Sequence, residues 1–140
     1  MDLLPASRPP APDVELRVWT LDDFAQLAQL RAALHGALAE GAGDAAVVGE
    51  LIEKVAVVAT ELATNALRHG LPPTTVRLSR ADDRFLLDVA DHDLAAVPEL
   101  DEERPFGQGG LGLLFAHRFS LETGWYTTAA TKHVWATFPR

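Results

Sequence analysis

The part of the chain most suggestive of chemistry is a glycine-rich run directly before an expected helix at 111–119. Backbone without side chains approaches a ligand closely, and the free N–H groups at a helix N-terminus bind phosphate. The run matches the G-x-G-x-x-G pattern of dinucleotide-binding folds, but no strand precedes it and 28 residues follow it, so we reject that interpretation. Taken alone, the run fits a flexible loop equally well. It comprises Gly107, Gln108, Gly109, Gly110, Leu111 and Gly112.

A second feature is a carboxylate and an amide four positions apart, Glu61 and Asn65, in a stretch with helical periodicity. Both lie along one edge of the apolar stripe that we expect to face the core. Polar groups at the border of a core are costly unless something pairs with them. The competing interpretation is a solvated edge, with Glu61 facing Lys54 or Arg68 in a weak surface pair. The stripe consists of Leu51, Val55, Val58, Leu62 and Ala66, and His69 falls at its centre, which predicts a buried histidine.

A third feature is the acidic end of an expected strand, Asp91 to Asp93. An Asp at a strand end is usually a turn residue. Calcium binding is disfavoured because the tight glycine of an EF-hand loop is missing. The five histidines show no paired metal-ligand spacing, so a zinc site is not expected either.

The helices and strands that must position these residues are predicted from hydrophobic periodicity and from the residue types that begin and end such elements. Alternating or apolar stretches predict strands at 14–19, 76–79, 85–90, 120–126 and 133–138. A first helix is expected from Thr20, whose spacing to Asp23 resembles a capping box, and a second runs about 25 residues from Asp44 to Gly70. We therefore predict an α+β two-layer sandwich with a mixed, mostly antiparallel sheet and helices on one face. Residues 1–13, with four prolines, are expected to be a mobile arm, and 14–140 a single domain.

Composition narrows the classes of function. The 140 residues carry 12 Lys and Arg against 20 Asp and Glu, a formal charge of −8. This balance argues against nucleic-acid binding, which needs a basic surface. With no cysteine, disulfides and thiolate zinc sites are excluded. No apolar run reaches the ~18 residues of a membrane span, and no basic leader opens the chain, so we expect a cytoplasmic protein without membrane contact.

Together, the three features resemble one family. The segment ELATNALRHG at 61–70 is similar to the asparagine-bearing helix motif of the GHKL ATPase superfamily, which contains histidine kinases and gyrases. Asp91 after a strand resembles its adenine-reading aspartate, and the segment at 110–113 resembles its second glycine motif. The small anti-sigma-factor serine/threonine kinases are the most similar branch, and the ending at 131–135 resembles their final strand. The resemblance covers roughly 14–138 and implies the Bergerat ATPase fold.

The resemblance also implies roles and ligands. Asn65 would place its amide oxygen on Mg²⁺, and Glu61 would act as the general base toward an attacking hydroxyl. Asp91 would accept a hydrogen bond from the adenine amino group, where guanine offers a carbonyl instead. Gly107, Gly109, Gly110, Leu111, Gly112 and Leu113 would surround the ATP phosphates beneath a lid at 93–109.

Two positions depart from the family's pattern. The first glycine motif, usually Asp-x-Gly-x-Gly, has neither glycine at 91–95, and His133 stands where the final strand usually offers Thr. Two functions therefore remain. One is a kinase that phosphorylates a Ser or Thr of an anti-sigma antagonist, and the other is a nucleotide-gated module that sequesters a sigma factor without useful catalysis. A histidine kinase is disfavoured because His35 has no acidic neighbour. The resemblance also allows a homodimer.

Overall fold

The structure is a computed structural model in which residues 4–40, 45–95, 116 and 118–139 are described. One layer is a five-stranded sheet in the order β1-β2-β3-β5-β4. All four neighbouring pairs are antiparallel, so the mixed sheet expected from the sequence is antiparallel throughout its named strands. The strands are β1 (Val14–Leu21), β2 (Thr74–Ala81), β3 (Arg84–Asp91), β4 (Glu122–Thr127) and β5 (Lys132–Pro139).

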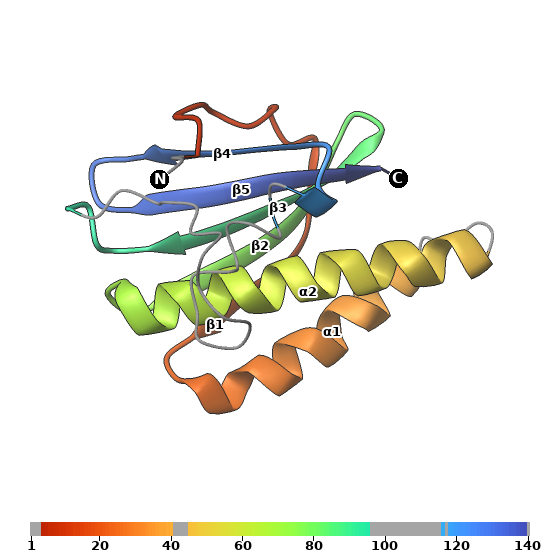
Figure 1. Ribbon diagram of the computed structural model, residues 1–140, viewed down its shortest axis with the longest axis horizontal. Coiled ribbons are helices and arrows are strands. Elements are labelled where there is room, and N and C mark those ends of the chain that lie inside the picture. The colour runs from red at the N-terminus through yellow and green to blue at the C-terminus, as the bar shows by residue number, and fades with distance from the viewer. Residues whose placement is uncertain (1–3, 41–44, 96–115, 117, 140) are drawn as a thin grey trace.

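The second layer is a pair of helices, α1 (Leu27–Ala39) and α2 (Ala45–His69), which cover one face of the sheet (Figure 1). A single 3-10 turn, η1 (Phe24–Gln26), leads into α1. The capping box lies three residues later than the sequence predicts: Asp23 caps the turn, and the Gln26 side chain accepts from the backbone of the cap. Within the described ranges, no helix is long and apolar enough to cross a membrane. The predicted two-layer α+β architecture is confirmed.

The core lies between the two layers. On β3, Phe85, Leu87 and Val89 point toward the helices and join one buried cluster with the α2 stripe. Successive strand residues face opposite sides, so Leu86 and Asp88 lie on the other face of the sheet, where Trp135 also packs. Four of the five predicted α2 stripe residues are buried, and Leu51 is partly buried.

His69 is exposed, so the predicted core histidine is wrong. The α2 helix ends at this residue, one turn past Ala66, the last buried side chain of the stripe. Hydrophobic periodicity alone does not show where the helix extends beyond the part that packs against the sheet.

The described part of the N-terminal segment, 4–13, departs from the mobile arm expected from its prolines. Leu4 is buried in the core, and Ala6 forms a parallel bridge with Trp125 at the outer edge of β4. The segment then passes behind the sheet toward β1 (Figure 1). On its way the Ser7 carbonyl accepts a hydrogen bond of 2.8 Å from the Trp135 indole. We call residues 4–13 the N-terminal strap.

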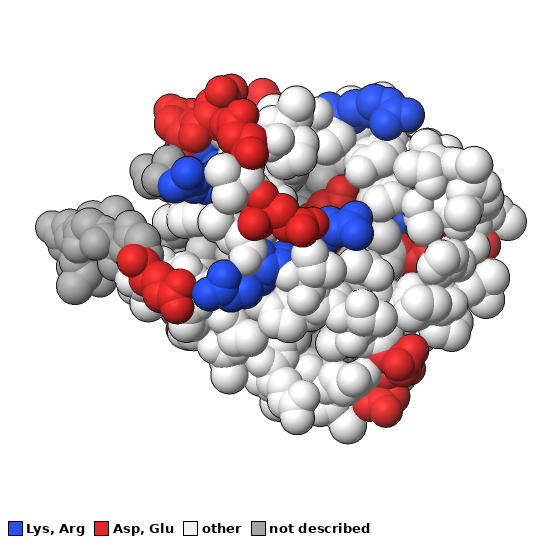
Figure 2. Space-filling model, turned by 180° about the vertical axis from the view of Figure 1, so that it is seen from behind, with Lys and Arg blue, Asp and Glu red and all other residues white. Residues whose placement is uncertain are grey.

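On the face turned away in Figure 1, several charged side chains lie close to side chains of opposite sign, while one acidic and one basic group stand apart (Figure 2). Four ion pairs of Lys or Arg with a carboxylate among the described residues lie outside the candidate site and leave at least 35% of each side chain exposed. Such pairs contribute little to stability because water screens them. They are Arg17–Glu40, Arg31–Glu53, Arg77–Glu15 and Arg84–Glu122, at 3.2 to 3.4 Å.

Candidate functional site

The end of α2 meets the end of β3 at Gly70. A Cβ atom at Gly70 would lie 2.6 Å from the Asp91 Cγ atom and 2.7 Å from its Oδ2 atom, so only glycine leaves room for this carboxylate. The His92 N–H donates to the Leu71 carbonyl at 3.0 Å and ties the two chain segments together. The helix that carries Glu61 and Asn65 is thereby anchored on the strand that ends in Asp91.

Asp91 is a buried carboxylate, 5% exposed, with partners on both oxygens. Its Oδ1 atom accepts from the Asp93 N–H at 2.7 Å, and its Oδ2 atom lies 3.6 Å from the Lys132 Nζ atom. Lys132 is the residue of β5 directly opposite Asp91 in the antiparallel register. The site therefore holds a negative and a positive group side by side on the helix-covered face of the sheet.

Glu61 and Asn65 are both half-buried on α2. They are one turn apart, and Asn65 precedes Gly70 by five residues, which is about 7.5 Å along a helix axis. Burial raises the pKa of the Glu61 carboxyl above its ordinary value, and the positive charge of Arg68 opposes this effect. A carboxylate with a raised pKa is a stronger proton acceptor than an ordinary surface glutamate.

The comparisons with known proteins agree with this geometry. The family model described as the histidine kinase-like ATPase domain matches residues 24–138, which is most of the chain. The chain belongs to this family. The GHKL resemblance of the sequence is thereby confirmed. No curated protein sequence matches the chain.

Among solved structures, the histidine kinase-like domain described here is similar to "the RsbU and RsbW domains of Rv1364c from Mycobacterium tuberculosis". The TM-score is 0.62 at 17% sequence identity, over 88% of this chain and 32% of that one. The chain thus spans about a third of the length of that protein. At this identity the similarity supports the Bergerat ATPase fold.

The donor set of this histidine kinase-like domain fits magnesium held mainly by a nucleotide. In the described ranges, no three His, Cys, Asp or Glu side chains gather closely enough to hold a metal by themselves. One amide oxygen beside one carboxylate suits Mg²⁺, which takes oxygen ligands, keeps several waters and is otherwise bound by phosphates.

Six of the predicted phosphate-binding residues lie outside the described part of the structure: Gly107, Gly109, Gly110, Leu111, Gly112 and Leu113. The predicted lid falls there too, except for its first residues. The helix expected at 111–119 is described only at Ala116, Arg118 and Phe119, whose backbones are helical.

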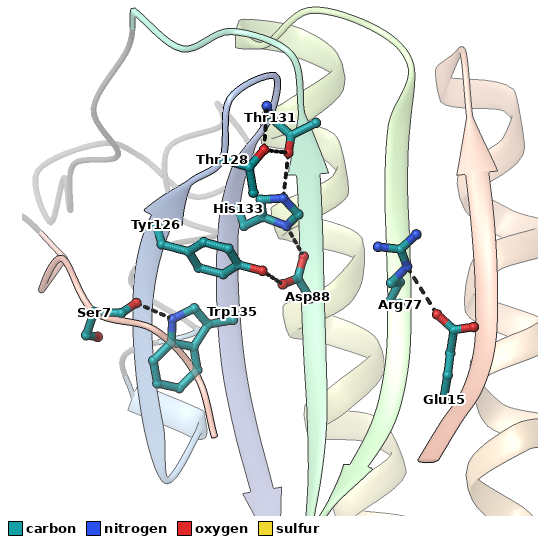
Figure 3. Close-up of polar contacts among 9 residues, drawn as sticks. All are labelled: Ser7, Glu15, Arg77, Asp88, Tyr126, Thr128, Thr131, His133 and Trp135. Atoms are coloured by element: carbon teal, nitrogen blue, oxygen red, sulfur yellow. Dashed lines mark hydrogen bonds and ion pairs between the residues drawn. The ribbon is translucent and has the colours of Figure 1, made fainter. Parts of the chain in front are cut away.

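Sequence reasoning did not single out Lys132 and noted only its neighbour His133, as a departure from the family's Thr. His133 points to the opposite face of the sheet (Figure 3), where its Nδ1 atom lies 2.7 Å from the Asp88 Oδ1 atom. The presence of His133 in place of the family's Thr therefore does not alter the surroundings of Asp91. The signal for Lys132 was the antiparallel pairing of β3 with β5, which places one residue of the final strand directly opposite Asp91.

On the face of the sheet opposite the helices, a cluster of polar side chains forms hydrogen bonds among its own members. The Tyr126 hydroxyl donates to the Asp88 Oδ2 atom at 3.0 Å, and the Tyr126 and His133 rings stack with centroids 4.5 Å apart. The His133 Nε2 atom lies 2.7 Å from the Thr131 hydroxyl. Burial, followed by the charge and hydrogen bond of Asp88, raises the pKa of Tyr126. This cluster is part of the packing of the sheet rather than of the candidate nucleotide site.

Proposed function

We propose that this chain binds Mg·ATP and transfers the γ-phosphate to a Ser or Thr hydroxyl of a protein antagonist in a cytoplasmic partner-switching system. The observation that carries the proposal is the contact of Gly70 with Asp91, which joins the helix of Glu61 and Asn65 to the end of β3. In this proposal the Asp91 carboxylate, which contacts the base, and the Asn65 amide, which lies on the side of the phosphates, belong to one site. The similarity to a structure that contains an RsbW domain supports a partner-switching role.

Each described residue has a separate task in this proposal. Asp91 accepts a hydrogen bond from the adenine amino group, and Asn65 holds Mg²⁺ through its amide oxygen. The bound metal neutralises charge on the phosphates. The Glu61 carboxylate takes the proton of the acceptor hydroxyl, and the raised pKa of Glu61 suits that task. Phosphate contacts are assigned to the glycines at 107–112, and the partner is a sigma factor, its antagonist, or both.

A second candidate function is a nucleotide-gated module that sequesters its partner without useful catalysis. The observation in its favour is the segment at 91–95, which lacks both glycines of the family's first glycine motif. Asp93 also adds a negative charge close to Asp91, where a polyanionic ligand would bind. Both features weaken nucleotide binding and leave less binding energy for catalysis.

The test separates binding from phosphotransfer in variants of the full chain. Asn65→Ala removes a metal ligand and should weaken Mg·ATP binding and phosphotransfer together. Glu61→Gln keeps the shape but cannot take a proton, so it should leave ATP affinity nearly intact and lower phosphotransfer by about 10²–10⁴-fold. Calorimetry measures binding, and labelled ATP with co-purified partners measures transfer.

Glu53→Gln is the matched control on the same helix. Its carboxylate is 57% exposed and pairs only with surface groups of α1, so both measurements should match the wild type. If the wild type phosphorylates no partner but ATP or ADP alters partner affinity, the gated module is the function. If Glu61→Gln unfolds the protein while Glu53→Gln does not, Glu61 is structural and the kinase proposal fails.

A further inference from the structure

On the face of the sheet opposite the helices, Asp88 and His133 form a hydrogen-bonded line with Thr131, which lies in the hairpin between β4 and β5 (Figure 3). The Asp88 Oδ1 atom lies 2.7 Å from the His133 Nδ1 atom, and the His133 Nε2 atom lies 2.7 Å from the Thr131 Oγ1 atom. A hydroxyl within hydrogen-bond reach of an imidazole that a third group orients is the arrangement of an activated nucleophile.

The directions of these hydrogen bonds follow from the chemistry of the carboxylate. An ionised carboxylate only accepts hydrogen bonds, so the His133 Nδ1 atom carries the hydrogen and donates it to Asp88. In the neutral imidazole the Nε2 atom is then the acceptor, and the Thr131 hydroxyl donates to it. The Tyr126 hydroxyl donates to the other oxygen of Asp88 at 3.0 Å and holds the carboxylate in place. The imidazole is thereby oriented to take the proton of Thr131.

A second hydroxyl supports Thr131 from the other side. The Thr128 Oγ1 atom lies 2.6 Å from the Thr131 Oγ1 atom and accepts from the N–H groups of Ala130 at 3.3 Å and Thr131 at 3.1 Å. Because the hydrogen of the Thr131 hydroxyl goes to His133, the Thr128 hydroxyl is the donor between the two threonines. A donor at the Thr131 oxygen stabilises the negative charge that develops there when the proton leaves.

The hydroxyl lies at the accessible end of this line. Asp88 and His133 are 8% and 6% exposed, whereas Thr131 is half-buried and Thr128 is exposed. The turn between the two threonines is closed by its backbone, because the Thr128 N–H donates to the Thr131 carbonyl at 2.8 Å. The hairpin is therefore held without the contact of Thr131 with His133, and that contact calls for a role besides closing the turn.

We propose that Thr131 is a modification site whose hydroxyl takes an acyl group from an activated ester or thioester. The Thr131 oxygen attacks the carbonyl carbon of the donor, and its proton passes to the His133 Nε2 atom. A bond forms between the Thr131 oxygen and this carbon, and the bond from the carbon to the leaving oxygen or sulfur breaks. The leaving group then takes the proton from His133. The products are an ester of Thr131 and a free alcohol or thiol.

The experiment treats the full chain with p-nitrophenyl acetate as the acyl donor. Absorbance measures the release of p-nitrophenolate, and mass spectrometry of peptides locates the acetyl group. In the wild type, we expect Thr131 to be acetylated about 10²–10⁴-fold faster than Thr127, an exposed threonine of the same hairpin, which is the usual contribution of a general base. His133→Gln should remove this excess. Thr131→Ser keeps a hydroxyl and should stay reactive, whereas Thr131→Val keeps the shape without a hydroxyl and should not react at this position.

Thr127→Val is the matched control. It removes an exposed hydroxyl close to Thr131 and should leave the release of p-nitrophenolate unchanged. Reaction of Thr131→Ser but not of Thr131→Val supports the inference, because a merely structural loss does not distinguish the two variants by their hydroxyl. Equal acetylation of Thr127 and Thr131 in the wild type, or acetylation confined to other groups, overturns the inference. This comparison is made within one protein, so it needs no variant to fold.

Discussion

Asp88 and Asp91 stand three residues apart on β3 and represent two different uses of a buried carboxylate. Asp88 faces away from the helices and is bound at 2.7 Å by His133 and at 3.0 Å by Tyr126 (Figure 3). Asp91 faces the helices, lies 3.6 Å from Lys132 and fills the space left by Gly70. Each oxygen of Asp88 has a side-chain partner at short distance, whereas Asp91 has one short hydrogen bond, from the Asp93 N–H, and one longer contact, with Lys132.

The difference teaches how burial should be interpreted in this fold. A closed network satisfies every buried polar atom and holds strands together, and it leaves little capacity for a ligand. A loosely paired carboxylate beside a glycine keeps acceptor capacity, and Gly70 places Asp91 at the end of the helix that carries Glu61 and Asn65. Burial alone does not distinguish the two carboxylates, and the difference in their hydrogen-bond partners is what makes Asp91 the candidate.

The largest effect on stability is expected from Asp88→Ala. The change leaves the Tyr126 hydroxyl and the His133 Nδ1 atom buried without an acceptor, and each such loss costs roughly 1–3 kcal/mol. We expect the free energy of unfolding to fall by about 3 kcal/mol, measured by urea denaturation, with the ATP affinity of the folded protein unchanged.

Glu15→Ala is the control for this change, because Glu15 is an exposed carboxylate that pairs with Arg77. Surface pairs of this kind contribute about 0–1 kcal/mol. If Asp88→Ala is no more destabilising than Glu15→Ala, the closed network is not what holds this face. If it abolishes ATP binding in the folded protein, the division between the two carboxylates is wrong.

A smaller loss of stability, joined to a loss of function, is expected from Gly70→Ala. The added methyl group would meet the Asp91 carboxylate and the Ala66 carbonyl at 2.6 Å, so the end of α2 or the carboxylate must move. Such overpacking typically costs 1–3 kcal/mol. We expect this range in urea denaturation, together with weaker Mg·ATP binding in calorimetry, because Asp91 is displaced.

Gly36→Ala is the control for Gly70→Ala and should change the free energy of unfolding in the opposite direction. Nothing lies within 4 Å of a Cβ at Gly36 in α1, so this change should stabilise the protein by about 0.5–1 kcal/mol through helix propensity. ATP affinity should not change. Equal ATP affinity in the wild type and Gly70→Ala would show that the position of Asp91 does not matter to the nucleotide.

Most of the fold could be predicted because local signals determine it. The α2 helix is bounded by Gly70 and by the residues before Ala45, and the alternation along β3 identifies its buried face. The N-terminal strap could not be predicted in this way. The strap binds to the sheet through backbone pairing with β4, which is distant in the sequence. It also depends on Gly124, because a Cβ atom at this position would lie 3.0 Å from the Pro5 carbonyl oxygen.

The places of the candidate residues in the fold were predictable where local signals determine them. Spacing places Glu61 and Asn65 on one edge of α2, and the strand pattern places Asp91 at the end of β3. Lys132 is 41 positions beyond Asp91, and only the register of β3 with β5 makes the two neighbours. A shift of one residue in that register would place His133 opposite Asp91 instead of Lys132, and the sequence alone does not fix the register.

The smallest expected effect tests the half-buried state of Glu61 through the pH dependence of stability. Because burial raises the pKa of Glu61, the folded protein binds this proton more tightly than the unfolded chain does. The charged form of Glu61 therefore destabilises the folded state, and this penalty develops as the pH rises from the ordinary glutamate range through the raised pKa.

Glu61→Gln removes the penalty, so it should stabilise the protein by less than about 1 kcal/mol at pH 7–8, since solvent screens a half-exposed group. The gain should disappear near pH 4, where the carboxyl is protonated in both states. Urea denaturation at the two pH values measures this difference, and Glu53→Gln should show none. A loss of stability at pH 7 would instead mean that the charge of Glu61 is paired with Arg68, as the surface-pair interpretation of the sequence holds.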